Sequence, residues 1–521
     1  MTDRTLVHRV NVGDALTRVA FGRPDALAVV DGDRRWTYGE FDTWVNRLAH
    51  GLTARGYTTG DVLALASANS AEFLAVYYAC AKLGLVCVPI NLGWRSDEVA
   101  YVLGHSQARG IVVERQLAGV IAPAVAQVSG VTDVILAPGT GGEATGLDID
   151  DVLFDDTTSP EVVVEDRAPL SYLYTSGTTA SPKGVVGTHL AIHLESMSAA
   201  LDSGWRADDR FIAMMPMFHT AQLNAFCTPA IVVGATIFVH RGFDPERFLD
   251  TIERERITQV FGLPMMYRAA LDHPSFGGRD LSSLRRAVYA MAPMPEAQIK
   301  ACLDGFRCDF ALLFGQTEMS PITTLFRPEH QLSHVGAVGT PLTGVQVGIM
   351  DPDGNLLPRG EQGEIVYRAP STMQEYLRNP EATAEAFRHG WFHSGDVGRF
   401  GPDGVLWFAD RYKDVIKTGG ENVASIEVER AVYDTEPNIA EVVVVGLPHE
   451  RWTEAITAVV VPKPGERIDA DDLRLRLKDR LDGYKVPKAV IVTDELPRTS
   501  TGKIQKNVVR ERHAGHYGST E

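Results

Sequence analysis

The first part of the chain alternates apolar runs with amphipathic runs. Residues 26–30 and 62–66 have the composition of short buried strands. Between them, Thr37-Tyr38-Gly39-Glu40 matches a capping box, and apolar residues recur after it at helical spacing. Residues 73–90 predict a packed helix that leads into a buried strand. This alternation continues to about residue 293 without a repeat, and it predicts a layered α/β domain.

From about residue 336 the pattern changes. Asp353-Gly354 and Asp403-Gly404 each lie between apolar runs, which is typical of β-hairpins. We therefore predict a β-rich subdomain over about 336–410, which completes a large N-terminal domain at 1–412. Residues 413–521 predict a small, mobile α/β domain, with a helix near 426–433, strands near 441–445, 455–461 and 489–492, and a leucine-rich helix at 473–481.

Composition and charge exclude several classes of function. The formal net charge is -17 and no basic block is present, which disfavours nucleic acid and anionic membranes as partners. Five cysteines at unrelated spacings match no zinc site, and the N-terminus has no apolar signal core. The longest apolar stretch is too short to cross a bilayer. We expect a cytoplasmic enzyme without a membrane span, and its oligomeric state stays open.

A segment rich in small polar residues is the first candidate site. Residues 174–184, YTSGTTASPKG, follow an alternating strand at 170–174. Hydroxyl groups and glycines after a strand allow backbone N–H groups to approach phosphate oxygens, and Lys183 adds positive charge. It is not a Walker loop, because Lys183 is followed by Gly184. A flexible loop in solvent is the alternative interpretation.

This segment resembles the phosphate-binding signature of the adenylate-forming superfamily. That superfamily contains acyl-CoA synthetases, adenylation domains of peptide synthetases and firefly-type luciferases. Its other motifs follow in order, so the resemblance covers nearly the whole chain. It implies that ATP is bound by Thr175, Ser176, Gly177, Thr178, Thr179 and Lys183.

Two further motifs resemble the nucleotide site of the superfamily. In the first, FGQTE, Phe314 would stack on adenine and Glu318 would help hold Mg²⁺, with Gly315, Gln316 and Thr317 between them. The superfamily more often has tyrosine at the position of Phe314. In the second, WFHSGD, Asp396 would accept hydrogen bonds from the ribose hydroxyls.

The remaining motifs resemble the hinge and the small domain. DRYKD at 410–414 implies a hinge in which Arg411 reaches the nucleotide and Lys413 is the pivot. KTGGEN at 417–422 implies a loop that lines the channel of the CoA thiol, where two glycines permit positive φ. That loop comprises Gly419, Gly420 and Glu421. The next residues, Val423-Ala424-Ser425, depart from the commoner Ile-Tyr-Pro. Near the C-terminus, PRTSTGK implies that Lys503 completes the adenylation site.

The resemblance implies a two-step ligation. A carboxylate is already ionised at pH 7, so it needs no general base, but cations must offset its repulsion from ATP. Magnesium and Lys503 would supply them, and the acyl-adenylate would then pass to the thiol of CoA. The implied catalytic residues are Thr175, His219, Glu318 and Lys503.

The acyl group is predicted to be apolar. Residues 211–240 contain no Asp or Glu, whereas a buried α-ammonium group would need a carboxylate partner. His219 resembles the residue beside the acyl carboxylate, although a hydrogen-bonded core histidine is the alternative. Met291 should reshape the segment around it. We expect a fatty, alicyclic or aryl acid and cannot choose among them.

Three alternatives remain at this point. The acceptor thiol could belong to a carrier protein supplied in trans, since no carrier domain follows Lys503 in this chain. A luciferase-like oxygenase is the second alternative, and light emission with a luciferin-type acid would test it. A silent nucleotide-binding homologue is opposed by the joint presence of Lys183, Glu318, Asp396, Arg411 and Lys503.

Overall fold

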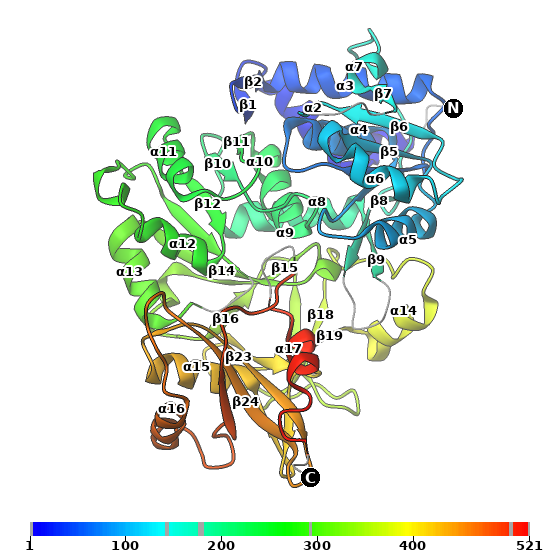
Figure 1. Ribbon diagram of the computed structural model, residues 1–521. Coiled ribbons are helices and arrows are strands. Elements are labelled where there is room, and N and C mark those ends of the chain that lie inside the picture. Colours follow the sequence, from blue (N-terminus) through cyan, green and yellow to red (C-terminus); the bar gives the residue numbers. More distant parts are fainter. Residues whose placement is uncertain (1–3, 141–144, 176–181, 291–293, 500–503, 519–521) are drawn as a thin grey trace.

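The computed structural model describes residues 4–140, 145–175, 182–290, 294–499 and 504–518. A large N-terminal domain with two mixed sheets is followed by a small C-terminal domain with its own sheet (Figure 1). The predicted α/β class is therefore confirmed. None of the helices within the described residues has the length and hydropathy of a bilayer-spanning helix.

One sheet of the large domain has seven strands in the order β7-β6-β5-β3-β4-β8-β9. Neighbouring strands are parallel except for β8 and β9, which form an antiparallel pair. The predicted strand at 62–66 is β3. The strands are β3 (Val62–Ala66), β4 (Val86–Pro89), β5 (Gly110–Glu114), β6 (Asp133–Ala137), β7 (Leu147–Asp148), β8 (Pro169–Thr175) and β9 (Lys183–Thr188).

The other sheet has thirteen strands in the order β17-β18-β19-β20-β16-β15-β14-β13-β12-β10-β11-β1-β2. The strands from β14 to β1 are parallel, and both ends of the sheet are antiparallel. The strands are β1 (Leu27–Asp31), β2 (Arg34–Thr37), β10 (Arg210–Ala213), β11 (Thr236–Val239), β12 (Gln259–Gly262), β13 (Arg286–Tyr289), β14 (Asp309–Gly315), β15 (Ile322–Phe326), β16 (Ala337–Pro341), β17 (Gln346–Met350), β18 (Gly363–Arg368), β19 (Phe392–Phe400) and β20 (Leu406–Arg411).

The β-rich part expected at 336–410 is present, but it continues an existing sheet. Strand β16 pairs with β15 on one side and with β20 on the other. The hairpin turns lie at the expected dipeptides, with φ of +88° at Gly354 and +84° at Gly404. Antiparallel pairing already begins at β15, so the change of pattern near residue 336 lies within the antiparallel part of one sheet.

Helices between the sheets form the main core. Helix α4 is buried along its whole length, and residues of both sheets pack around it. Its Lys82 Nζ donates to Asp42 Oδ1 and Asn46 Oδ1, each at 2.5 Å, so the buried ammonium is satisfied. The helices are α1 (Arg4–His8), α2 (Val12–Gly22), α3 (Tyr38–Ala54), α4 (Ala71–Leu83), α5 (Ser96–Ser106), α6 (Ala118–Val125), α7 (Ile149–Val152), α8 (His189–Asp202), α9 (Thr220–Gln222), α10 (Thr228–Val233), α11 (Pro245–Glu255), α12 (Pro264–Leu271), α13 (Glu296–Phe306) and α14 (Pro380–Ala386).

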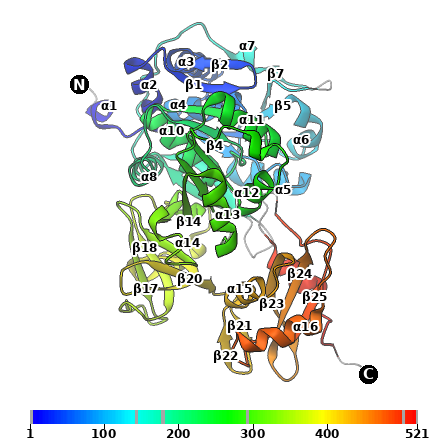
Figure 2. The ribbon, with the colours of Figure 1, turned by 90° about the vertical axis from the view of Figure 1, so that its left-hand side faces the viewer.

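The small domain has a five-stranded sheet covered by helices (Figure 2). Its helix α17 was not expected, because its sequence is mostly charged and Val509 alone among its residues is buried. The elements are β21 (Ile416–Thr418), β22 (Glu421–Val423), α15 (Ser425–Thr435), β23 (Ile439–His449), β24 (Thr453–Pro462), α16 (Ala470–Arg476), β25 (Ala489–Val492) and α17 (Lys506–His513).

The chain passes between the two domains over a few residues. Strand β20 ends at Arg411 in the thirteen-stranded sheet, and β21 begins at Ile416 in the small sheet. Helix α15 packs near β20, and Arg430 of this helix occupies the space beside Gly336 of the large domain. A Cβ atom at Gly336 would lie 2.0 Å from that guanidinium, so a side chain there would have to displace Arg430, and the φ of +88° also favours glycine.

Candidate active site

Thr175 and Lys183 lie directly opposite each other. Thr175 is the last residue of β8, Lys183 is the first residue of β9, and the two are partners in the antiparallel ladder. The hydroxyl residues predicted to bind phosphate connect these two positions in the sequence. Ser176, Gly177, Thr178 and Thr179 lie outside the described residues. The ladder therefore fixes both ends of the predicted phosphate-binding segment.

Tyr376 connects Lys183 with Glu318. The phenol of Tyr376 donates to Glu318 Oε1 at 2.8 Å, and Lys183 Nζ lies 5.0 Å from the centre of the same ring. Burial raises the pKa of Tyr376, and the carboxylate of Glu318 raises it further, so the phenol stays a hydrogen-bond donor. Two motif residues that are 135 positions apart are thus brought to one side chain.

Phe314 and Gly315 form the edge of the predicted adenine site. The ring of Phe314 lies 5.4 Å from that of Phe408 on β20, which fixes its orientation. Gly315 is in tight contact with the chain, since a Cβ atom there would lie 1.9 Å from the carbonyl oxygen of Pro321. The backbone N–H of Gln316 donates to that same oxygen at 2.9 Å. Thr317 begins the short helical turn that contains Glu318.

Asp396 and Arg411 are cross-strand partners. They are paired in the ladder of β19 and β20, and Arg411 Nε lies 3.1 Å from Asp396 Oδ1. The Asp396 side chain is buried, while that of Arg411 is partly exposed. Two separate motifs therefore place a carboxylate and a guanidinium together, where each can meet a nucleotide.

A charged network surrounds Lys413. Arg510 of α17 bonds Asp414 Oδ1 at 2.7 Å, and its second contact is the carbonyl oxygen of Lys413 at 3.5 Å. Burial lowers the pKa of Lys413, and the guanidinium of Arg411 lowers it further. Burial opposes ionisation of Asp414, but Arg510 holds the pKa of that carboxyl below its usual range. Helix α17 is therefore bonded to the chain at the predicted pivot.

Ser425 links the two domains through the same network. Asp410 Oδ2, on the last strand of the large domain, accepts the backbone N–H of Ser425 at 2.5 Å and its hydroxyl at 2.6 Å. Lys506 donates to Ser425 Oγ and lies 2.8 Å from Glu429 Oε1. Proline, the commoner residue at this position in the sequence pattern, could donate neither bond. The departure noted at Val423-Ala424-Ser425 therefore adds a bond between the domains.

The glycine loop of the small domain lies apart from the predicted nucleotide-binding residues described above. Gly419 and Gly420 connect β21 to β22 with φ of +60° and +90°, the backbone that the two glycines led us to expect. Figure 2 shows this hairpin at the end of the small domain that faces away from the large domain. Glu421 begins β22 on the same hairpin. These three residues are not brought to the nucleotide group in this arrangement.

His219 is a half-buried, neutral histidine at the start of α9. Burial lowers its pKa to about 4, so the imidazole is uncharged at neutral pH. Its Nε2 is buried and has no hydrogen-bond partner among the described residues. The preceding loop is held by Asn69, whose Oδ1 accepts the N–H of Met217 at 2.8 Å. Lys503 and Met291, the other predicted residues, lie outside the described part of the chain.

The comparisons with known proteins decide the family. The sequence matches the AMP-binding enzyme family over residues 16–377 and the AMP-binding enzyme C-terminal domain over residues 427–503. The chain belongs to the AMP-binding enzyme family. The predicted membership of the adenylate-forming superfamily is confirmed.

Relatives of this AMP-binding enzyme match over nearly their whole length. A feruloyl-CoA synthase of Amycolatopsis sp is 38% identical over 94% of this chain and 96% of its own. The fatty acid–[acyl-carrier-protein] ligase ScoC of Streptomyces coeruleorubidus is 34% identical over 94% of each chain. Among solved structures, ATP-bound MatB of Rhodopseudomonas palustris has a TM-score of 0.88 at 29% identity, covering 97% of this chain and 100% of its own.

Sequence reasoning missed three residues of this AMP-binding enzyme that the structure brings into contact with the site or its neighbours. Tyr376 and Phe408 have no motif around them that separates them from other aromatic residues. Glu195 on α8 is buried near the segment 211–240, and a scan of that segment alone could not find it. Each contact depends on chain segments that are distant in the sequence.

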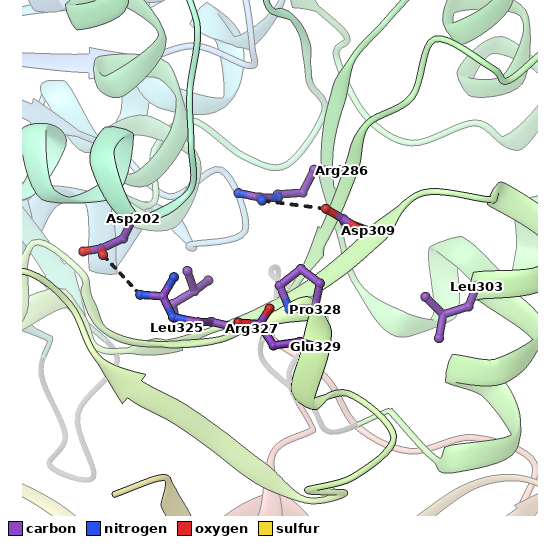
Figure 3. Close-up of a pocket in the computed structure, with 8 residues that line it drawn as sticks. All are labelled: Asp202, Arg286, Leu303, Asp309, Leu325, Arg327, Pro328 and Glu329. Atoms are coloured by element: carbon purple, nitrogen blue, oxygen red, sulfur yellow. Dashed lines mark hydrogen bonds and ion pairs between the residues drawn. The ribbon is translucent and has the colours of Figure 1, made fainter.

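A cavity of about 380 Å³ lies away from these residues (Figure 3). Arg286 and Asp309, which line it, are the first residues of the parallel strands β13 and β14. Open α/β sheets bind ligands at the carboxyl ends of their strands, which is the opposite edge. Two ion pairs, Arg327 with Asp202 and Arg286 with Asp309, neutralise the arginines there. No predicted site residue lines this cavity.

The bond from Ser425 to Asp410 predicts a graded effect of substitution. Ser425 is the first residue of α15, where proline is tolerated, and Ala424 before it is extended. Ser425→Pro removes both donors and should lower the free energy of unfolding by about 1–3 kcal/mol, and Ser425→Ala should lower it less. Hydrogen exchange should quicken over residues 410–425.

The matched control is Ser96→Pro, at the first position of α5, where the hydroxyl has no partner among the described residues. It should change neither stability nor exchange at 410–425. Wild-type protection in both Ser425 variants would show that this bond does not join the domains.

Proposed function

We propose that this AMP-binding enzyme is an ATP-dependent, AMP-forming acyl-CoA ligase. It activates a carboxylic acid as an acyl-adenylate with release of pyrophosphate, and it then transfers the acyl group to CoA. The convergence of Lys183 and Glu318 on Tyr376 is the observation that supports this most. The side chain of Tyr376 thus contacts both a cation that could bind phosphates and a carboxylate that could bind a metal.

In this proposal, different residues bind the phosphates, the adenine and the ribose of the nucleotide. Thr175, Lys183 and the loop between them hold the phosphates, Phe314 stacks on adenine, and Asp396 binds the ribose while Arg411 contacts the nucleotide. Tyr376 holds one oxygen of Glu318 and orients the other toward Mg²⁺. Bound Mg²⁺ would offset the negative charge of the phosphates during attack by the acyl carboxylate.

The donor set fits magnesium bound together with a nucleotide. Among the described residues no group of three or more His, Cys, Asp or Glu side chains could hold a metal ion. Glu318 alone suits Mg²⁺, which retains several waters and takes phosphate oxygens as ligands. His219, uncharged at neutral pH, can donate a hydrogen bond to the acyl carboxylate from its orphan nitrogen.

We propose that the two half-reactions use two arrangements of the small domain. The domains meet between residues 412 and 413, and Lys413 is the pivot. In the described arrangement the chain on both sides of residues 500–503 runs beside the large domain, as both views show, while the Gly419-Gly420 hairpin faces away (Figures 1 and 2). Lys503 would act in this arrangement. A rotation would then bring Gly419, Gly420 and Glu421 to the thiol channel.

For the acyl group we propose an apolar acid, either fatty, alicyclic or aryl. The absence of Asp and Glu from 211–240 supports this, as do relatives named for a feruloyl group and for fatty acids. ScoC, named as a ligase of the acyl-carrier protein, favours a carrier protein in trans as the second candidate acceptor. All five cysteines are free thiols, which suits a cytoplasmic location.

A substrate panel tests the proposed reaction. Pyrophosphate release and AMP formation should be faster with some unsubstituted fatty or aryl acid than with every proteinogenic amino acid. Adding CoA should yield the thioester. An amino acid as the best substrate would refute the acyl assignment, and nucleotide binding without AMP formation would favour a silent homologue. Thioester formation only with a carrier protein would replace CoA as the acceptor.

Glu318→Gln tests the metal ligand. The loss of one charged oxygen should raise the Mg²⁺ concentration needed for half-maximal adenylation by about tenfold or more. Tyr376→Phe is the matched control, since it keeps the carboxylate and removes the bond that orients it, so its shift should be smaller. A magnesium titration of Glu318→Gln that superimposes on the wild type would remove this residue from the site.

A pair of variants tests the two arrangements. Lys503→Ala should abolish acyl-adenylate formation and still convert supplied acyl-adenylate and CoA to thioester. Lys413→Pro should do the reverse, because proline fixes φ near -65° and freezes the pivot in the adenylating arrangement. Pyrophosphate release and consumption of synthetic acyl-adenylate follow the steps separately. Parallel loss of both steps in both folded variants would exclude two arrangements.

A further inference from the structure

Glu195 is a buried carboxyl whose hydrogen bonding is poor. It lies on α8, is 1% exposed, and neither of its oxygens has a hydrogen bond of good geometry among the described residues. Burial raises its pKa well above the usual value, and the nearby backbone of Ile322 opposes this only in part. Burial therefore favours the neutral carboxylic acid, and the group disfavours folding because water would satisfy it better in the unfolded chain.

Polar side chains bond one another near α8, inside an otherwise apolar core. Tyr77 OH donates to Asn224 Oδ1 at 3.3 Å, and Asn224 Nδ2 donates to Thr220 Oγ1 at 3.1 Å. Glu195 is close enough to Tyr77 to contribute to the raised pKa of that phenol, which is due mainly to burial. Its neighbour Ser196 lies 2.6 Å from Thr228 Oγ1, so this face of α8 packs on α10.

Asn224 belongs to the π-helix Leu223–Cys227, which directly follows α9. A π-helical turn is rare, and such turns occur frequently at functional sites. Helix α8 packs against this turn as well as against β15. The distorted turn therefore packs on the helix that carries Glu195.

Two chain segments lead from the proposed active site to this carboxyl. The first begins at His219, beside the proposed acyl carboxylate, and runs through α9 to Asn224. The second begins at Glu318 and reaches Ile322, which lines a cavity together with Glu195. That cavity has a volume of about 10 Å³, enough for about one water molecule.

We infer that Glu195 is a specificity-determining residue at the closed end of the acyl pocket, and that the substrate is an acid with an apolar body and a hydroxyl group remote from its carboxylate. This rests on the proposed function. A neutral carboxyl has one donor and one carbonyl acceptor, which matches a hydroxyl group that also donates and accepts. A site built to bond a hydroxyl discriminates strongly against the analogue that lacks it.

The role in binding and a purely structural role make opposite predictions for stability and selectivity. Replacing an unpaired buried carboxyl by an apolar side chain of similar size should stabilise the fold. If Glu195 serves only the fold, removing it should destabilise the protein and leave selectivity unchanged. If it serves substrate recognition, its removal should raise stability and abolish selectivity.

The experiment compares matched pairs of acids on the full chain. The probes are 3-phenylpropanoate with 3-(4-hydroxyphenyl)propanoate and octanoate with 8-hydroxyoctanoate. In the wild type, kcat/KM for at least one hydroxylated acid should exceed that of its parent by about tenfold or more. In Glu195→Met that ratio should fall to about one, while kcat/KM for the parent acid should change little. The melting temperature of this variant should be higher than that of the wild type. Glu195→Gln, which still donates and accepts, should keep part of the ratio.

Ser196→Ala is the matched control on the same helix, because Ser196 is buried but bonded. It should lower stability and leave the ratio unchanged. A wild-type enzyme that prefers no hydroxylated acid, or a ratio that survives in Glu195→Met, would overturn the inference. A preference for 3-(4-aminomethylphenyl)propanoate over both of its analogues would also overturn it, since an ammonium group requires the ionised carboxylate.

A second readout separates this inference from the proposed function. If no acid yields AMP or thioester, the ligase assignment fails. Binding of each acid without ATP or CoA can still be measured, as the increase in the melting temperature of the protein, and this increase tests the role of Glu195. The hydroxylated acid should then stabilise the wild type more than its parent does, and Glu195→Met should remove that difference. Equal shifts in both proteins would reject the inference.

Discussion

A short stretch of backbone pairing ties the two large sheets together, and the candidate site depends on it. Residues 374–377, which follow β18 of the thirteen-stranded sheet, pair along the free edge of β9 in the other sheet. Gln374 N–H donates to the carbonyl of Val186 at 2.9 Å, Val186 N–H to that of Glu375 at 3.0 Å, and Leu377 N–H to that of Gly184 at 2.8 Å. This pairing sets Tyr376 between Lys183 and Glu318. Without it, no backbone pairing would join the sheet of the predicted phosphate-binding segment to the sheet of the predicted metal-binding motif.

The features that could be predicted from sequence are those fixed by local interactions. The capping box of α3 forms as expected, with Glu40 N–H donating to Thr37 Oγ1 at 3.2 Å and Thr37 N–H to Glu40 Oε2 at 2.8 Å. Strands β3 and β25 begin and end at the predicted residues. The motif resemblance located Lys183, Asp396 and Arg411, and the structure pairs the last two directly. Their individual roles remain proposals.

The features that could not be predicted depend on distant segments. Tyr376 acquires its position from an edge pairing that no periodicity indicates. Glu195 lies on a helix whose sequence gives no sign of which neighbour it faces, and the argument from an acid-free segment at 211–240 overlooked it for that reason. Helix α17 has too few apolar residues to show a helical period, yet its Lys506 bonds Glu429 and its Arg510 bonds Asp414, next to the predicted pivot. Continuous sheet pairing through β16 likewise leaves no trace in the hydrophobic pattern.

The hairpin of β21 and β22 packs against Trp452, and this contact has a consequence for tryptophan fluorescence. The N–H of Gly419 bonds the carbonyl oxygen of Trp452 at 2.9 Å, and the indole packs so close that a side chain at Gly419 would touch it. Trp452 is the only tryptophan beyond residue 412, and it is partly exposed. Any motion that transfers this hairpin from solvent to a protein surface also changes the polarity around a single fluorophore. The chain therefore contains an intrinsic emission probe in its small domain, which would report the arrangement of that domain without a label once the six other tryptophans are replaced.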